Sequence, residues 1–203
     1  MTSATAAPAP ERTSAARERL LRTASRLFYT EGIHAVGVER IVAEAQVTRA
    51  TFYRHFPGKE ELVVAYLRAQ DAEVRARLGA EPQDPREAAT LLRAMVEGMG
   101  GEICRTGFRG CPFINAAAEY PDPAHPVHVA VVEHRAWLET VARHALERSG
   151  HPDAEGAART FMMLRDGAMV AGYLDDPRRA SEGLRAAVET LVASGTSETH
   201  AAG

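Results

Sequence analysis

The sequence predicts an all-helical protein with about nine helices. Along most of the chain, apolar residues recur at the three- and four-residue spacing of an amphipathic helix. No β-branched run alternates apolar and polar side chains, as a strand in a half-buried sheet would. With 203 residues, 45% of them hydrophobic and 25% charged, the chain can bury one sizeable core or two smaller ones.

The N-terminal part predicts three helices after a short arm. Met1–Pro10 is rich in small residues and proline and predicts a disordered arm. One apolar stripe predicts the first helix over about Arg12–Glu31, and Gly32 ends it as a C-cap. Two short helices follow, one over 38–45 and one that starts near Thr48 as its N-cap.

The rest of the chain predicts six more helices. The Pro57–Gly58 pair breaks the chain before the fourth helix. Asp176 as N-cap and Pro177 at the first helical position predict the start of the ninth. Residues 196–203 are expected to form a disordered tail. The six helices are expected at about 62–78, 86–103, 113–120, 127–149, 154–173 and 177–193.

Charge is unevenly distributed along the chain. Residues 11–78 carry twelve Arg or Lys against nine Asp or Glu, a balance of +3, whereas residues 79–203 carry twelve against eighteen, a balance of −6. A basic front half fits a segment that meets a polyanion such as nucleic acid. The alternative is an ordinary solvated helical surface, on which imbalances of this size are common.

The composition argues against a membrane, secreted or disulfide-bonded protein. No stretch approaches the roughly 20 apolar residues of a membrane helix, and the start has neither a basic segment nor a hydrophobic run. We therefore expect a cytoplasmic protein with no membrane partner. With only Cys104 and Cys111 and no CxxC pair, we expect no disulfide framework, no structural metal site and no cofactor.

The two short helices joined by a tight turn predict a helix-turn-helix that binds double-stranded DNA. A recognition helix needs an outer face of hydrogen-bond donors and an apolar inner face that fixes its angle. Arg49 can make a bidentate contact with guanine, and Thr51 can contact a base. The inner face is expected to hold Val47, Ala50, Phe52 and Phe56. The residues expected to contact DNA are Gly37, Val38, Thr48, Arg49, Ala50, Thr51, Tyr53, Arg54, His55 and Lys59.

The spacing of these residues resembles the TetR (tetracycline-repressor-like) family of bacterial transcriptional regulators. The family signature has Ala-x-x-Leu-Phe in an apolar first helix, a glycine, then Ile-Ala-x-x-Ala-Gly-Val-Ser-x-x-Thr-Leu-Tyr-x-His-Phe and Lys-Glu-x-Leu. The resemblance covers about residues 14–74, with the helix-turn-helix at about 37–56. The matching residues are Ala24, Leu27, Phe28, Gly32, Ile41, Ala45, Val47, Thr48, Thr51, Phe52, Tyr53, His55, Phe56, Lys59, Glu60 and Leu62.

Three departures from the signature bear on individual contacts. Val36 and Gly37 stand where the family usually has Thr or Ser at the start of the second helix, so a phosphate-contacting hydroxyl is missing there. Gln46 replaces the usual glycine of the turn and is expected to adopt a positive φ. Val42 replaces the usual alanine.

The resemblance implies the organisation of the whole chain. Residues 11–58 would form the DNA-binding domain, and residues 59–195 a helical domain that binds a ligand and forms a homodimer. It implies a transcriptional regulator and not an enzyme. We expect a repressor of a palindromic operator that is released by a small, largely hydrophobic effector, whose identity the sequence does not give.

The last two predicted helices suggest how a dimer would form. The helix at 154–173 is apolar around most of its circumference, and such a helix must be buried on every side. A four-helix bundle with a second copy would bury what one chain cannot, and burial within one chain is the alternative. The residues expected at the interface are Phe161, Leu164, Ala168, Leu184, Val188 and Leu191.

The stretch at 107–120 is the most specific part of the C-terminal half. Its Gly-Cys-Pro-Phe run at 110–113 resembles one branch of the family, the lincomycin-resistance-repressor-like (LmrA/YxaF type) regulators. This loop could wall a pocket or be only a tight corner. Arg165 and Asp166 are costly in a buried helix unless paired, and could bind a polar ligand group or pair across the dimer. The residues expected to line the pocket are Met95, Met99, Cys111, Phe113, His134, Trp137, Arg165, Asp166 and Met169.

Three other interpretations remain open at this stage. A metal-responsive regulator could use His125, His128, Asp122 and Cys111, although this set is incomplete. A thiol-responsive regulator could use Cys104 and Cys111. An enzyme could use Cys111 as a nucleophile with a distant histidine as base, but no GxSxG, phosphate-loop or HExxH motif supports it.

Overall fold

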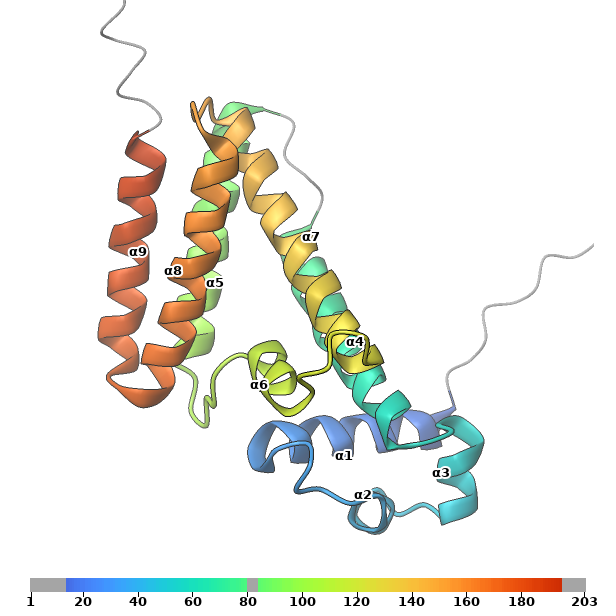
Figure 1. The fold of residues 1–203 in the computed structure, drawn as a ribbon. Coiled ribbons are helices and arrows are strands. Elements are labelled where there is room, and N and C mark those ends of the chain that lie inside the picture. Colours follow the sequence, from blue (N-terminus) through green and yellow to red (C-terminus); the bar gives the residue numbers. More distant parts are fainter. Residues whose placement is uncertain (1–13, 80–83, 195–203) are drawn as a thin grey trace, which may run out of the picture. The chain divides into compact units, whose positions relative to one another are not determined.

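The computed structural model describes residues 14–79 and 84–194, and this part of the chain contains nine α-helices and no strand (Figure 1). The predicted fold class is therefore confirmed. The expected arm at 1–10 and tail at 196–203 lie outside the described residues. The helices are α1 (Ala15–Glu31), α2 (Val38–Glu44), α3 (Arg49–His55), α4 (Lys59–Leu78), α5 (Pro85–Ile103), α6 (Pro112–Glu119), α7 (Pro126–Arg148), α8 (Ala154–Leu174) and α9 (Pro177–Ser194).

The chain divides into two compact units, Met1–Leu62 and Val63–Gly203. The division falls inside α4, a few residues after the boundary that the sequence predicts at residue 58. The first unit holds α1, α2 and α3, and the second holds α5 to α9. Each unit has its own set of buried apolar side chains.

In the first unit, α1 packs against α2 and α3, and α2 packs against α3. Leu20 and Leu27 of α1, Ile41 of α2 and Phe52 of α3 are completely buried. The ring centroids of Phe52 and Phe56 lie 6.1 Å apart. Because the buried side chains come from all three helices, the packing fixes the angle at which α3 is held.

Charged side chains connect α1 to α2 on the surface of the first unit. Arg26 donates a hydrogen bond to Glu44, and Arg40 donates to Glu31 (2.7 Å) and to Glu44 (2.9 Å). These hydrogen bonds, from Arg40 and then Arg26, hold the pKa of Glu44 below its usual value. Single exposed ion pairs contribute little to stability, so it is the linked arrangement that helps to orient α2.

The turn between α2 and α3 depends on one residue whose backbone has a left-handed conformation. Gln46 has a φ of 53°, as the sequence predicts for this position. The backbone N–H groups of Gln46 and Val47 donate to the carbonyl oxygens of Ala43 and Val42, both at 3.2 Å. The last carbonyls of α2 are thus satisfied while the chain turns toward α3.

In the second unit, α8 packs against α7 and α9, and α5 packs against α7, α8 and α9. The short α6 packs against α7. α5 and α8 approach so closely that a Cβ added at Gly172 would lie 2.4 Å from Cγ2 of the buried Ile103. A glycine is therefore required at this crossing, because packed atoms do not come so close.

Four residues predicted at a dimer interface belong instead to the core of the single chain. Phe161 and Ala168 of α8 and Leu184 and Val188 of α9 are each at most 8% exposed. They are therefore not available to a partner, and the prediction is corrected for these four. Packing of α9 against α8 and α5 buries them within one chain, which was the alternative.

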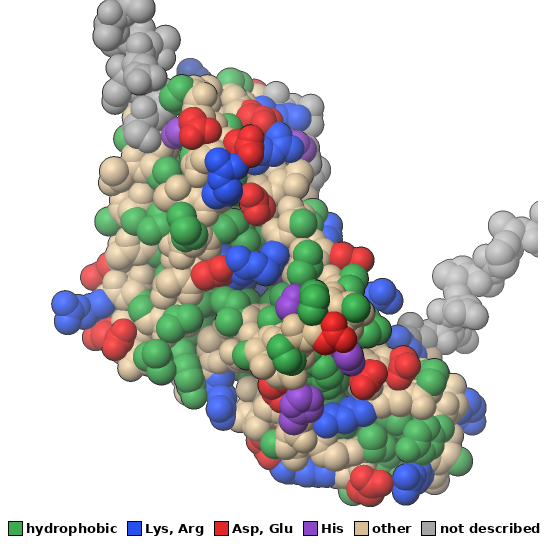
Figure 2. Space-filling view, viewed as in Figure 1, with side chains coloured by type: hydrophobic (Ala, Val, Ile, Leu, Met, Phe, Trp, Pro, Cys, Tyr) green, Lys and Arg blue, Asp and Glu red, His purple; other side chains and the backbone are tan. Residues whose placement is uncertain are grey.

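Within the single chain, α8 is not buried on every side. Met163, Val170 and Leu174 are 67%, 46% and 69% exposed, and Figure 2 shows hydrophobic side chains at the surface over this helix. Met163, Gly167, Val170 and Leu174 follow one another at spacings of four, three and four residues, so they share one face of α8. We call these four residues the α8 stripe.

Candidate nucleic-acid interface and ligand cavity

The residues predicted to contact DNA all remain accessible around α3 and its flanks. None of the ten is buried, which a surface for DNA requires. Ala50 is exposed, so its assignment to the apolar inner face is wrong, whereas Phe52 and Phe56 are buried as predicted. Gly37, Thr48, Arg49, Ala50, Tyr53 and Arg54 are exposed, and Val38, Thr51, His55 and Lys59 are half-buried.

Thr48 is the N-cap of α3, as the sequence predicts. Its Oγ1 accepts a hydrogen bond from the backbone N–H of Thr51 at 3.1 Å. The two hydroxyl groups of Thr48 and Thr51 lie 2.9 Å apart and share a further hydrogen bond. This cap satisfies one of the free amides at the start of a short helix and fixes the position of both hydroxyls.

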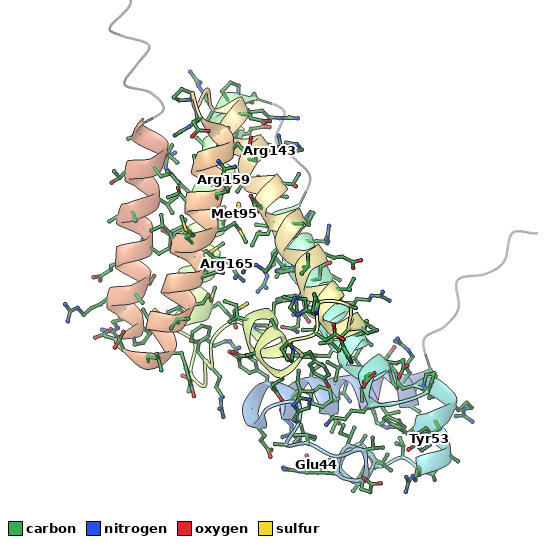
Figure 3. The ribbon with its side chains drawn as sticks, viewed as in Figure 1. Glu44, Tyr53, Met95, Arg143, Arg159 and Arg165 are labelled. Atoms are coloured by element: carbon green, nitrogen blue, oxygen red, sulfur yellow. The ribbon has the colours of Figure 1, made fainter. Side chains whose placement is uncertain are left out.

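Arg49 stands at the first position of α3 with its guanidinium held by two neighbours. Its Nη2 donates to the Tyr53 hydroxyl at 3.5 Å, and its Nη1 lies 3.3 Å from Oε1 of Glu39 in α2. The Tyr53 hydroxyl and the Glu39 carboxylate raise the pKa of Arg49, so the group stays charged. Tyr53, labelled in Figure 3, is 46% exposed. Since the Arg49–Glu39 pair is exposed and contributes little, a base edge that accepts two hydrogen bonds from the guanidinium can replace the carboxylate.

The ends of α2, α3 and α4 supply further groups suited to phosphate. His55 Nε2 lies 3.4 Å from the Ser14 hydroxyl, which fixes the imidazole ring at the end of α3. Lys59 is the first residue of α4, where the helix dipole favours an anion. Gly37 is the N-cap of α2 and has no side chain to cap it, as expected from the missing hydroxyl.

The second unit contains a cavity of about 320 Å³, lined by α4 to α8 and by the loop before α6. Its size lies at the lower end of the range of small-molecule sites. Trp137 and Asp166 do not line it, so their assignment to the pocket is corrected. The predicted residues that the structure brings together around it are Met95, Met99, Cys111, Phe113, His134, Arg165 and Met169.

His134 is a buried residue at the wall of this cavity and is held by two neighbours. Its Nδ1 lies 2.7 Å from Oδ1 of Asp71, and its ring stacks on Phe113 with centroids 3.6 Å apart and planes 3° apart. Burial lowers the pKa of His134, although Asp71 opposes this change. The neutral imidazole therefore donates its Nδ1–H to Asp71.

Asp71 and Trp137 form the outer support of His134. Burial acts to raise the pKa of Asp71, but hydrogen bonds from Arg75 (2.6 Å) and His134 outweigh it and keep the pKa low. The Arg75 guanidinium also lies 4.0 Å from the centroid of the Trp137 ring. Trp137 thus stabilises the position of Arg75 through a cation–π contact and does not face the cavity.

Arg165 is a buried cation in the cavity wall, 5% exposed. Its Nη1 donates to Oδ1 of Asp166 at 2.7 Å, and its Nη2 donates to Sγ of Cys111 at 3.1 Å. Its Nε is buried without a hydrogen-bond partner. Burial opposes the charge of Arg165, but Cys111 and Asp166 raise its pKa, so the charge persists.

Asp166 joins Arg165 to a second arginine. Nη1 and Nη2 of Arg135 donate to Oδ1 and Oδ2 of Asp166, at 3.0 and 2.7 Å. Burial acts to raise the pKa of Asp166, but the hydrogen bonds from Arg135 and Arg165 lower it overall. Two arginines therefore share one carboxylate in this cluster, which pairs within the chain.

The Gly-Cys-Pro-Phe run forms the turn that brings Cys111 and Phe113 to the cavity. Gly110 has a φ of 81°, a conformation that suits glycine. Cys111 is the N-cap of α6 and Pro112 occupies its first turn. Asn115 Nδ2 donates to the Arg109 carbonyl at 2.9 Å and closes the loop. The loop is both a tight corner and a wall of the cavity.

Several residues of the cavity were missed by sequence reasoning. On α5, Leu91, Gly98 and Glu102 share a helix face with Met95 and Met99, since they are three or four residues apart. This spacing could have predicted them as cavity residues. Asp71, the partner of His134, had no such signal because it lies far away along the chain. The lining residues missed are Gln70, Val74, Arg77, Leu78, Leu91, Ala94, Gly98, Glu102, Phe108, Gly110, Pro112 and Leu138.

Two negative findings concern the described part of the chain. Within residues 14–79 and 84–194, no group of three or more His, Cys, Asp or Glu side chains is placed to hold a metal ion. None of the helices in the same ranges is long and apolar enough to cross a membrane. Both cysteines of the chain are free thiols, Cys104 exposed and Cys111 buried.

Comparison with known proteins identifies related regulators. A family model described as "Bacterial regulatory proteins, tetR family" matches residues 20–66. The crystal structure of SCO4454, a TetR-family transcriptional regulator from Streptomyces coelicolor, is 49% identical in sequence with a TM-score of 0.83. This similarity covers 89% of the present chain and 96% of SCO4454, so both units are represented.

Two curated relatives come from Bacillus subtilis (strain 168). The uncharacterized HTH-type transcriptional regulator YxaF is 24% identical over 160 residues, which are 76% of this chain and 84% of YxaF. The HTH-type transcriptional regulator LmrA is 26% identical over 125 residues, 61% of this chain and 65% of LmrA. These are the regulators to which the Gly-Cys-Pro-Phe element points, so that resemblance is confirmed.

Proposed function

The chain belongs to the tetR family of bacterial regulatory proteins, DNA-binding transcriptional regulators that act as dimers, and from this premise we propose that it represses genes by binding a palindromic operator. The observation that carries the proposal is α3, a capped helix with exposed donors, held at a fixed angle by its buried inner face. We expect the protein to act in the cytoplasm, where the operator DNA lies.

The α8 stripe is the proposed centre of the homodimer interface. It is an exposed apolar face with a glycine in its middle, which allows two helices to approach closely. Leu164 and Leu191, both half-buried, are proposed to lie at its edge. A two-fold dimer presents two copies of α3 to successive major grooves, about 34 Å apart along the DNA.

The cavity is the proposed effector site. A ligand releases the operator only if it binds more tightly to a conformation that does not fit DNA. α4 provides a physical connection, since this single helix begins at Lys59 and carries the cavity residues Gln70 and Val74. We propose that ligand binding changes the position of α4 and thereby the spacing of the two α3 helices.

The alternative functions receive less support from the contacts around Cys111. The relatives are transcriptional regulators, a class of proteins that are generally not enzymes. The Cys111 thiol accepts a hydrogen bond from Arg165, a donor that cannot act as a general base. This contact therefore does not support an enzyme. Because Cys111 is buried, we also place a ligand-responsive regulator ahead of a thiol-responsive one.

Selection from a pool of random DNA tests the proposed function. The purified protein is expected to enrich an inverted repeat, and an Arg49→Ala/Tyr53→Ala variant is expected to lose it. Arg178→Ala, which removes an exposed charge from α9, is the matched control and is expected to enrich the same repeat. If the folded wild-type protein enriches no common sequence, the proposal is wrong.

Lys59 gives a second arm to this test. Lys59→Ala is expected to weaken binding to all DNA sequences, because a phosphate contact carries no base information. The slope of the logarithm of affinity against the logarithm of salt concentration should fall by about one unit. A loss restricted to one operator sequence would contradict the phosphate role.

A further inference from the structure

We propose that the cavity binds a hydrophobic monocarboxylate and that Arg165 receives its carboxylate group. This inference rests on the proposed ligand-responsive function and goes beyond it by naming the chemical class of the ligand. It is carried by the free donor edge of Arg165, by the charge of the surrounding cluster and by the apolar character of the remaining wall. Figure 3 labels Arg165 and Met95, whose side chains lie between the helices of the second unit.

The first step concerns hydrogen bonds. The Nε and Nη2 groups of a guanidinium form one edge with two parallel donors, the arrangement that matches a carboxylate. In Arg165 this edge has no oxygen acceptor: Nε is buried without a partner, and Nη2 donates only to the Cys111 sulfur, a weak acceptor. Asp166 occupies Nη1, on the other side of the group. A buried donor without an acceptor is costly, and a ligand oxygen would remove that cost.

The second step concerns charge. Arg165 and Arg135 share the single carboxylate of Asp166, so this cluster has one positive charge in excess. Asp71 pairs with Arg75 beside the neutral His134, and Glu102 pairs with Arg105, while Arg77 adds a further positive charge to the cavity wall. An anionic group is therefore favoured beside Arg165, and an ammonium group is disfavoured.

The third step concerns the rest of the ligand. The wall that α4, α5 and α7 contribute is largely apolar and includes Val74, Leu91, Met95 and Leu138. Its polar residues are Gln70, Arg77, Glu102 and His134. Methionine side chains adapt to ligands of different outline. With about 320 Å³ available, an alkyl chain or one aromatic ring fits beside these apolar groups.

Isothermal titration calorimetry on the protein without DNA tests this inference. The probes are hexanoate, octanoate, decanoate, phenylacetate, 3-phenylpropionate and 4-phenylbutyrate, each compared with its primary amide. At least one carboxylate is expected to bind about tenfold more tightly than its amide, because only the anion makes charge-assisted hydrogen bonds with Arg165. Octylamine and 3-phenylpropylamine are expected not to bind.

Variants separate Arg165 from its neighbour. Arg165→Met is expected to weaken carboxylate binding by about tenfold or more. Arg165→Lys keeps the charge without the two parallel donors, so its affinity for the carboxylate should lie between those of wild type and Arg165→Met. If circular dichroism shows that Arg165→Met is not folded, Arg165→Lys takes its place as the test variant. Arg135→Met removes the excess charge of the cluster but keeps the donors of Arg165, so it should weaken carboxylate binding less than Arg165→Met does. Arg159→Met is the matched control, since Arg159 is an exposed arginine of α8 that does not line the cavity, and it should bind like wild type.

Three results would overturn the inference: no binding of any carboxylate at millimolar concentration, equal binding of amides, or unchanged binding by both folded Arg165 variants. Each of these is distinct from a failure of the proposed function, because the selection of operator DNA is carried out without ligand.

Discussion

At the residue scale, the side chain best placed to contact a base is already engaged within the chain. Arg49 lies against Glu39 and Tyr53, so DNA must compete with both for the same guanidinium. Such intramolecular contacts restrict the arginine to a few rotamers before DNA binds, which lowers the entropy lost on binding. The Glu39 carboxylate opposes DNA, because it also brings a negative charge to a surface that must meet phosphates.

Removal of that carboxylate should tighten DNA binding. Glu39→Gln is expected to increase affinity for the selected operator about two- to fivefold, since it frees Arg49 and removes a repulsive charge. Fluorescence anisotropy with labelled operator measures the change. Glu73→Gln in α4 makes the same change of charge in the second unit and should have a smaller effect. Unchanged or weaker binding by Glu39→Gln would show that the carboxylate supports the interface.

His134 should make stability depend on pH. Its pKa is lowered in the folded protein by burial, so the unfolded chain takes up a proton at higher pH than the folded chain. Stability contributed by His134 is therefore full above the ordinary value of 6.5 and is lost as the pH falls below it. The lowered pKa of Asp71 acts in the same direction, but only near its ordinary value of 3.8.

Urea unfolding at pH values of about 7.5 and 5.5 tests this dependence. The wild-type midpoint should fall toward the lower pH, and His134→Gln should reduce that fall because glutamine does not titrate. His34→Gln, at an exposed histidine of the first unit, should leave the fall unchanged. An identical pH dependence in wild type and His134→Gln would contradict the account of this residue.

At the element scale, close helix crossings decide where glycine is required. Gly172→Ala would place a Cβ 2.4 Å from the buried Ile103, so we expect a destabilisation of ~1–3 kcal/mol. Gly183 in α9 is the control, since a Cβ there meets nothing within 4 Å. Gly183→Ala should stabilise the protein by ~0.5–1 kcal/mol through helix propensity. Equal effects of the two changes in urea unfolding would refute the proposed crossing.

The helices show why the sequence predicts elements better than their surfaces. Periodicity locates α8 and α9 closely, because apolar spacing and caps such as Asp176 are local signals. The sequence places the start of α7 at Val127, one residue later than the structure does. The N-cap is His125, whose Nδ1 accepts a hydrogen bond from the Val127 amide at 3.2 Å. Histidine is not among the preferred N-caps, so sequence rules overlook it.

The faces of α8 could not be assigned from the sequence for a different reason. When a helix is apolar around most of its circumference, the distribution of its apolar residues does not distinguish the side that faces the core from the side that faces a partner. Packing against α9 and α7 decides that Phe161 turns inward and Met163 outward. The same limit applies to the cavity, where Asp71 and His134 meet only through the tertiary fold.

At the scale of the whole molecule, dimerisation determines whether two α3 helices can act together. Val170→Glu places a charge in the α8 stripe and is expected to weaken the dimer by about tenfold or more, because a buried charge without a partner is costly. Sedimentation velocity over a range of concentrations measures this change. Thr90→Glu, at an exposed position of α5, should leave the dimer intact. A dimer unaffected by Val170→Glu would move the interface away from the stripe.

The central claim is that a two-fold dimer reads DNA through two copies of α3, and hydroxyl-radical footprinting on the selected operator tests it most directly. We predict two protected segments related by two-fold symmetry, with centres about one helical turn, or a whole number of turns, apart. Both segments should disappear together in the Arg49→Ala/Tyr53→Ala variant. A single protected segment, or two segments retained in that variant, would contradict the account.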